Sequence, residues 1–173
     1  MAIFAALPYK AREKRLGGGT MAEIDRTDRR ILNLLQADGR ISTVDLADKI
    51  GLSPTSTSER LKRLQREGFV CGFRAMLDPH RLGLELLVFV EVSLDKTTPD
   101  VFEKFGAAVR RAPEVLECHM VAGGFDYLVK TRVADMAAYR RFLGEILLAL
   151  PGVKETRTYA VMEEVKSDGV LPV

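Results

Sequence analysis

The chain has 173 residues, of which 47% are hydrophobic and 29% charged, and its net charge is only +2. No apolar run approaches the roughly 20 residues that a membrane span needs, so no membrane partner is expected and a cytoplasmic protein is predicted. The basic surplus lies before residue 73, and residues 73–173 carry a small acidic surplus, which leaves the N-terminal part as the one that could meet phosphate groups.

Residues 1–22 precede the first predicted helix. Their apolar stretch MAIFAALPY is short and comes before the charged KAREKR, which is the wrong order for a secretory signal. Three glycines then lead to a second methionine, Met21, which is a candidate alternative start of the protein. We expect an ordered fold only from about residue 22, with residues 1–22 as a disordered basic tail or arm.

Two short helices and a tight turn are predicted next. The first helix is capped by Asp25, carries an apolar face and ends at Asp38–Gly39. The second is capped by Ser42 and runs to Ile50, where Gly51 makes a turn of about three residues into a further helix. Helix, glycine-containing turn and helix together are the arrangement of a helix-turn-helix unit.

The third helix is predicted from Ser53 to Gly68. Ser53–Pro54 is a strong start signal, because serine caps a helix well and proline suits its first position. Thr57, Leu61 and Leu64 recur at helical spacing and form a narrow inward stripe. This helix is therefore expected to pack on the two before it.

The other face of the third helix carries short polar groups near its start and cations further along. That layout is typical of a helix that places its first turns against base edges and its later turns against phosphates. The candidate DNA-binding residues are Ser53, Thr55, Ser56, Glu59, Arg60, Lys62, Arg63 and Arg66. A solvated basic face, with the serines acting only as caps, is the alternative interpretation.

After an extended segment and a hinge, the sequence pattern changes to that of a second domain. The predicted elements are a strand at 84–94, a helix at 98–111 capped by Thr98, strands at 114–121 and 125–133, a helix at 135–150 and a strand at 154–165. The predicted domains are residues 23–72 and 84–166, separated by a hinge strand and linker at 73–83 and followed by a tail at 167–173.

The strand and helix order predicts a ferredoxin-like βαββαβ unit of four antiparallel strands with two helices on one face. The fold class is therefore α+β, with a three-helix (winged) helix-turn-helix domain in front. Leu87 and Phe89 lie opposite the apolar stripe that runs from Leu84 to Leu94, which implies that both faces of the sheet are covered. We expect a second copy to cover the outer face, giving a homodimer whose two recognition helices read two half-sites.

The cysteines and histidines give no sign of a metal site. Cys71, Cys118, His80 and His119 are too scattered for a Cys/His metal signature. The two cysteines are expected to be small apolar residues in a reducing cytosol. No metal and no cofactor are predicted.

Five stretches of the sequence resemble the Lrp–AsnC, or feast/famine, transcription regulators. In chain order they read DRTDRRILNLLQADGRIS, GLSPTSTSERLKRLQREGF, LVFVEVSL, ECHMVAGGFDYLVKTRV and LPGVKETRTYAVMEEVK. The resemblance runs from about residue 24 to residue 166 and is closest to the leucine-responsive branch of the family. It is specific, because two unrelated domains follow each other in the right order with the right linker.

The resemblance implies a bacterial regulator of amino-acid metabolism genes that binds double-stranded DNA through residues 53–66. Family members form dimers that assemble into tetramers, octamers or larger rings, and an amino-acid effector lies between neighbouring C-terminal domains. Carried over to this sequence, the effector site comprises Met120, Gly123, Gly124, Asp126, Met136, Tyr159, Ala160 and Val161. There Asp126 could pair with an α-ammonium group, and the backbone at Gly123–Gly124 could approach a carboxylate.

Other interpretations stay open at the level of sequence. Asp126 could simply be a turn residue bonded to backbone, and Met136 and Tyr159 could be core residues only. A nucleoid-type architectural protein would bind DNA with little sequence preference. A decarboxylase-like enzyme on the same architecture is the remaining rival, but no nucleophile–base pair is apparent, so the protein is not expected to be an enzyme.

Overall fold

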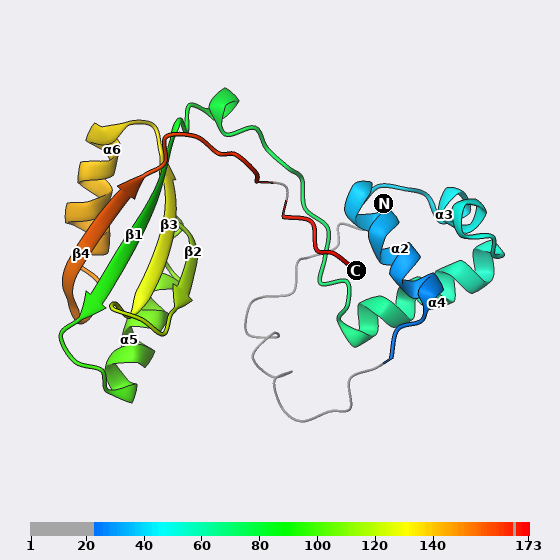
Figure 1. The fold of residues 1–173 in the computed structure, drawn as a ribbon, viewed down its shortest axis with the longest axis horizontal. Coiled ribbons are helices and arrows are strands. Elements are labelled where there is room, and N and C mark those ends of the chain that lie inside the picture. The colour runs from blue at the N-terminus through cyan, green and yellow to red at the C-terminus, as the bar shows by residue number, and fades with distance from the viewer. Residues whose placement is uncertain (1–22, 168) are drawn as a thin grey trace. The chain divides into compact units, whose positions relative to one another are not determined.

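The computed structural model describes residues 23–167 and 169–173 (Figure 1). The chain forms two compact units: an N-terminal unit that reaches Met76 and includes residues 169–173, and a C-terminal unit of residues 77–167. The predicted tail at 1–22, with Met21, lies outside the described residues. Within the described part of the chain, no helix is long and apolar enough to cross a membrane.

The three predicted helices of the N-terminal unit are confirmed. They are α2 (Arg26–Ala37), α3 (Thr43–Ile50) and α4 (Pro54–Glu67). Each begins after the expected cap, whose side chain accepts a hydrogen bond from a backbone N–H in the first turn; the caps are Asp25, Ser42 and Ser53. Since a cap satisfies a backbone donor that the helix itself cannot, these local signals fix where each helix starts.

A small apolar core holds the three helices together. Ile31 of α2, Leu46 of α3 and Leu64 of α4 are all at most 1% exposed. Between α3 and α4, Gly51 takes the left-handed conformation (φ 73°) that lets the chain turn sharply, and its N–H donates to the Ala47 carbonyl at 2.9 Å. The turn and the core together set the angle at which α4 leaves α3.

The last residues of the chain belong to the N-terminal unit. The Gln36 side chain on α2 makes two hydrogen bonds to the backbone of Leu171: its Nε2 donates to the carbonyl at 3.0 Å, and its Oε1 accepts from the N–H at 2.8 Å. Asn33 Nδ2 donates to the Val173 carbonyl at 2.8 Å. Residues 169–173 thus lie along α2, where the sequence predicted only a tail.

The C-terminal unit is the predicted antiparallel sheet with two helical segments. In chain order its elements are β1 (Leu86–Leu94), α5 (Pro99–Val109), β2 (Val115–Met120), β3 (Tyr127–Val133), α6 (Met136–Arg141), the π-helical η2 (Phe142–Leu147) and β4 (Val153–Ala160). The strand order is β2-β3-β1-β4, so β1 lies in the middle between β3 and β4. A short 3-10 turn, η1 (His80–Leu82), precedes β1.

One face of the sheet carries the core of this unit. Val88, Val90 and Val92 of β1 are fully buried and pack with Phe105 of α5 and Leu147 of η2. The residues between them in sequence point to the other face of the sheet. Leu87 and Phe89 are on that outer face, as the period-two pattern predicted.

The boundaries differ from prediction in places where tertiary pairing decides them. β4 ends at Ala160 and not at Val165, because its partner β1 begins at Leu86 and the last bond runs from Val161 N–H to the Leu87 carbonyl. For the same reason Leu84, the predicted start of the first strand, lies outside β1.

The two helical segments also depart from the predicted pattern. The predicted helix at 135–150 changes from α6 to a π-helix at Phe142, and both stop by Leu147. Thr98 stands at the cap position of α5 but makes no side-chain cap bond; its hydroxyl donates to the Asp100 carboxylate at 2.7 Å instead.

Candidate DNA interface and ligand site

The start of α4 presents small hydroxyl groups to solvent. Ser53 Oγ accepts from Ser56 N–H at 3.2 Å and donates to Ser56 Oγ at 3.1 Å, while Thr55 is exposed beside them. These hydroxyls surround the positive end of a 14-residue helix, a favourable place for a phosphate or a base edge. Ser53 acts as a cap, and its exposure leaves it accessible to DNA as well.

The predicted inward stripe of α4 is buried. Thr57 and Leu64 are both 0% exposed, and Leu61 is half-buried. The Thr57 hydroxyl donates to the Ser53 carbonyl at 2.9 Å, so this buried polar group is satisfied within its own helix. The opposite face of α4 exposes Glu59, Lys62 and Arg66 to solvent, as predicted; those three are therefore free to meet a duplex.

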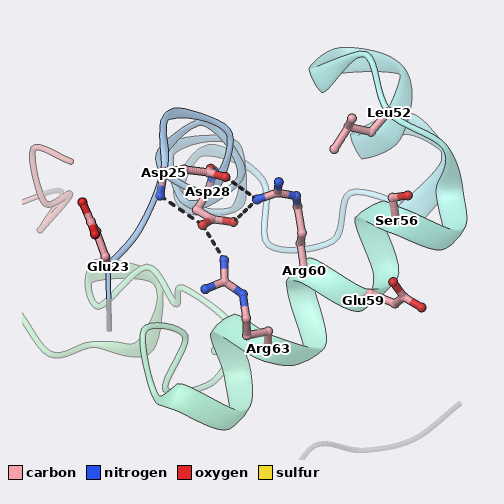
Figure 2. Close-up of a pocket in the computed structure, with 8 residues that line it drawn as sticks. All are labelled: Glu23, Asp25, Asp28, Leu52, Ser56, Glu59, Arg60 and Arg63. Atoms are coloured by element: carbon pink, nitrogen blue, oxygen red, sulfur yellow. Dashed lines mark hydrogen bonds and ion pairs between the residues drawn. The ribbon is translucent and has the colours of Figure 1, made fainter. Parts of the chain in front are cut away.

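Arg60 and Arg63 do not share that outward face. Figure 2 shows both guanidinium groups turned toward the start of α2. Arg60 Nη1 donates to Asp25 Oδ2 at 2.7 Å and to Asp28 Oδ1 at 2.9 Å, and Arg63 Nη2 donates to Asp28 Oδ2. The prediction that Arg63 points away from the core is therefore wrong, because a buried carboxylate on α2 holds it.

Asp28 is the residue of this region that sequence reasoning missed. Its side chain is 1% exposed and belongs to a reciprocal cap with Asp25, in which each carboxylate accepts from the backbone N–H of the other. A signal was present, since an acidic residue three positions after an N-cap is the pattern of a capping box. The arginines that complete the cluster come from 32 and 35 residues further along, which no local pattern reveals.

The hydrogen bonds and ion pairs shift the pKa of Asp25, Arg60 and Arg63. The pKa of Asp25 is lowered, first by the backbone N–H of Asp28 and then by the hydrogen bond from Arg60. The pKa of Arg60 is raised by its hydrogen bonds to Asp25 and Asp28, and that of Arg63 by its bond to Asp28. At neutral pH all of these groups are charged.

A hollow of about 550 Å³ opens between α2 and α4 beside this cluster (Figure 2). Its lining residues are Glu23, Asp25, Asp28, Leu52, Ser56, Glu59, Arg60 and Arg63. Four of them are acidic and two basic, so the lining carries more negative than positive charge. The hollow therefore does not resemble a phosphate pocket.

In the C-terminal unit, the predicted effector residues fall into two groups. Gly123, Gly124 and Asp126 form the β2–β3 turn together with Met120 at the end of β2. Asp126 lies at the C-terminal end of β1, where its Oδ2 accepts from Leu94 N–H at 2.7 Å. This bond fixes the turn to the end of the inner strand β1 and leaves the other carboxylate oxygen for a further partner.

The remaining effector residues lie at the opposite end of β1. Tyr159, Ala160 and Val161 close β4, whose last bond reaches the Leu87 carbonyl, and Met136 begins α6 directly after β3. From Leu87 to Leu94 the strand advances seven residues, or roughly 23 Å. The structure therefore does not bring the two groups together within one chain.

The exposed members of the second group can contact a partner. Met136 is 53% and Tyr159 44% exposed, so neither is a core residue. The Tyr159 hydroxyl donates to Glu91 Oε1 at 2.9 Å on the outer face of the sheet.

The fold and these two regions define a DNA-binding regulator with a separate ligand-binding domain. Residues 24–70 match a winged helix-turn-helix DNA-binding family, and residues 87–171 match the Lrp/AsnC ligand binding domain. The chain belongs to the Lrp/AsnC family of transcriptional regulators.

Similar proteins cover nearly all of the described chain. The leucine-responsive regulatory protein of Salmonella typhimurium (strain LT2) is 59% identical over 151 residues, which cover 87% of this chain and 92% of that protein. The protein of the same name from Escherichia coli (strain K12) is 58% identical with the same coverage.

Solved structures agree with the fold. A transcriptional regulator from Neisseria meningitidis in complex with L-Met has a TM-score of 0.82 and 37% identity, covering 87% of this chain and 97% of that one. An AsnC family transcriptional regulator from Agrobacterium tumefaciens has a TM-score of 0.82 and 32% identity, covering 86% and 97%.

Proposed function

We propose that this regulator binds an amino acid between the C-terminal domains of two neighbouring copies, and that this binding changes its affinity for selected duplex DNA sequences. The observation that carries the proposal is the separation of the two effector groups by the length of β1. A pocket that uses both groups needs the turn of one copy and the β4 end of another. Because such a site spans subunits, ligand binding there changes the free energy of assembly. The affinity of the assembly for DNA changes with it.

An amino acid suits the chemistry of the turn. Asp126 has one carboxylate oxygen beyond the bond to Leu94, which fits an α-ammonium group, and a Cβ at Gly123 or Gly124 would meet no atom within 4 Å. The backbone there can approach a ligand carboxylate closely. The relative from Neisseria meningitidis crystallised with L-Met, which supports an amino acid as the class of ligand.

A second copy of the chain is the proposed cover of the outer sheet face. That face carries the half-buried Phe89 together with charged groups that are already paired in the chain, such as Lys130 with Glu117 at 2.9 Å; Leu87 on the same face is already only 6% exposed. Paired charges can be buried against another surface at lower cost than lone ones. We expect a homodimer that assembles further into tetramers, octamers or larger rings in the cytoplasm, with no catalytic role.

A mobility shift tests the proposal against its rivals. The probe is the duplex upstream of the protein's own gene, and the control is a scrambled duplex of equal length, each with and without each of the twenty amino acids. Selective binding that changes with one or a few amino acids is the expected result. Equal binding to both duplexes at all conditions would indicate an architectural protein, and no binding at all would contradict the proposal.

A further inference from the structure

The ion-pair cluster of Asp25, Asp28, Arg60 and Arg63 joins the recognition helix to the helix that packs behind it. Asp28 is almost completely buried, and its carboxylate accepts from the Asp25 backbone and from both arginines. A buried charge is costly unless it is paired and hydrogen-bonded, so this carboxylate strongly favours the orientation of α4 that brings both arginines to it.

The two arginines are poorly placed to bind phosphate. Each is about a third exposed, yet the carboxylates of Asp25 and Asp28 contact them, and Glu67 Oε2 lies 3.5 Å from Arg63 Nη1. Glu23 and Glu59 line the same hollow (Figure 2). A phosphate that approached either guanidinium would also approach several negative charges at short range, where Coulomb repulsion is large.

Lys62 and Arg66 differ from these arginines both in exposure and in the absence of a carboxylate partner among the described residues. Both are exposed on the outward face of α4, and among the described residues neither has a hydrogen bond or ion pair to a carboxylate. They follow the hydroxyl-bearing first turn by two to three helical turns, along the same side as Thr55 and Glu59. Their charges are available to phosphates.

We propose that Asp28 is a positioning residue for DNA recognition: it fixes the recognition helix through Arg60 and Arg63, which act inside the domain, and leaves the phosphate contacts of α4 to Lys62 and Arg66. The inference rests on the DNA-binding role of α4. It divides the cations of α4 into two classes: arginines that form ion pairs inside the domain, and cations that contact phosphates. The sequence pattern predicted a single basic face.

The dependence of DNA affinity on salt separates the two classes. Each phosphate contact adds about 0.9 to the slope of log affinity against log salt, whatever its other effects. The experiment measures binding of the full chain to the duplex upstream of its own gene by fluorescence anisotropy over a salt series. The variants are Lys62→Met, Arg66→Met, Arg60→Met and Arg63→Met.

We expect Lys62→Met and Arg66→Met each to reduce the slope per bound chain by about 0.9. Arg60→Met and Arg63→Met should weaken binding roughly tenfold at every salt concentration, because a charge-assisted hydrogen bond that orients the helix is lost, while the slope stays unchanged. A slope reduced by about 0.9 in Arg60→Met or Arg63→Met would overturn the inference.

Variants of Asp28 test positioning apart from simple stabilisation. Asp28→Asn removes the charge and Asp28→Glu keeps it, and affinity is measured at a temperature where circular dichroism shows each variant fully folded. We expect Asp28→Asn to bind roughly tenfold more weakly although folded, and Asp28→Glu to recover most of the loss. Wild-type affinity in folded Asp28→Asn would refute a positioning role, and wild-type protein that bound no duplex would overturn the DNA-binding role itself.

Discussion

Truncation of Leu64 to alanine should strongly destabilise the N-terminal unit and leave the C-terminal unit unchanged. Leu64 is 0% exposed and lies in one small core with Ile31, Leu46 and Ile50. Replacing such a buried leucine with alanine costs about 3–5 kcal/mol, through lost apolar burial and the cavity left behind. A domain of roughly 50 residues has a total stability of only about 2.5–7.5 kcal/mol at 0.05–0.15 kcal/mol per residue, so most of it would be lost.

Differential scanning calorimetry of the full chain measures the effect, because the two units have separate cores and should melt separately. In Leu64→Ala the transition of the N-terminal unit should fall by roughly 15 °C or more, and DNA binding should weaken accordingly. The matched control is Leu147→Ala, which truncates a 0% exposed leucine in the other core and should move only the C-terminal transition. A single transition that both variants shift equally would refute two independent cores.

Three further predictions concern side chains with defined partners. Asp126→Asn keeps an acceptor for Leu94 N–H but removes the charge, so calorimetric titration should show a folded protein with amino-acid affinity reduced about tenfold or more; unchanged affinity would contradict the site. The hydrogen bond that His80 Nδ1 donates to the Glu85 carboxylate raises the pKa of His80 above 6.5. The stability that this bond contributes is therefore present below pH 6.5 and is lost as pH rises through the folded pKa; in NMR titrations Glu85→Gln should lower the pKa of His80, and an unchanged value would exclude the pair. Burial raises the pKa of the Cys118 thiol to about 11, so at pH 8 Ellman's reagent should modify exposed Cys71 first, and Cys71→Ser should abolish the fast phase.

Much of the fold could be predicted because its signals are local. Caps such as Asp25 and Ser53, the glycine turn at Gly51 and the alternating residues of β1 each act within a few positions of the chain. The ion pairs of the site could not be predicted from such local signals. Arginine has a long side chain that can turn to either flank of its helix, and only the packing of α2 against α4 brings the Asp28 carboxylate within reach of Arg63.

The amino-acid sequence alone determined that this protein has a three-helix DNA-binding domain followed by a ferredoxin-like domain, since capping, turn chemistry and apolar periodicity are properties of neighbouring residues. Tertiary structure decided where β4 ends, which cations of α4 face solvent, and that Asp126 and Val161 lie at opposite ends of β1. These outcomes depend on strand register and on ion pairs between residues more than thirty positions apart. The partner of each such charged group is determined only in the folded chain, because solvent and every other group of suitable charge compete for the same interaction.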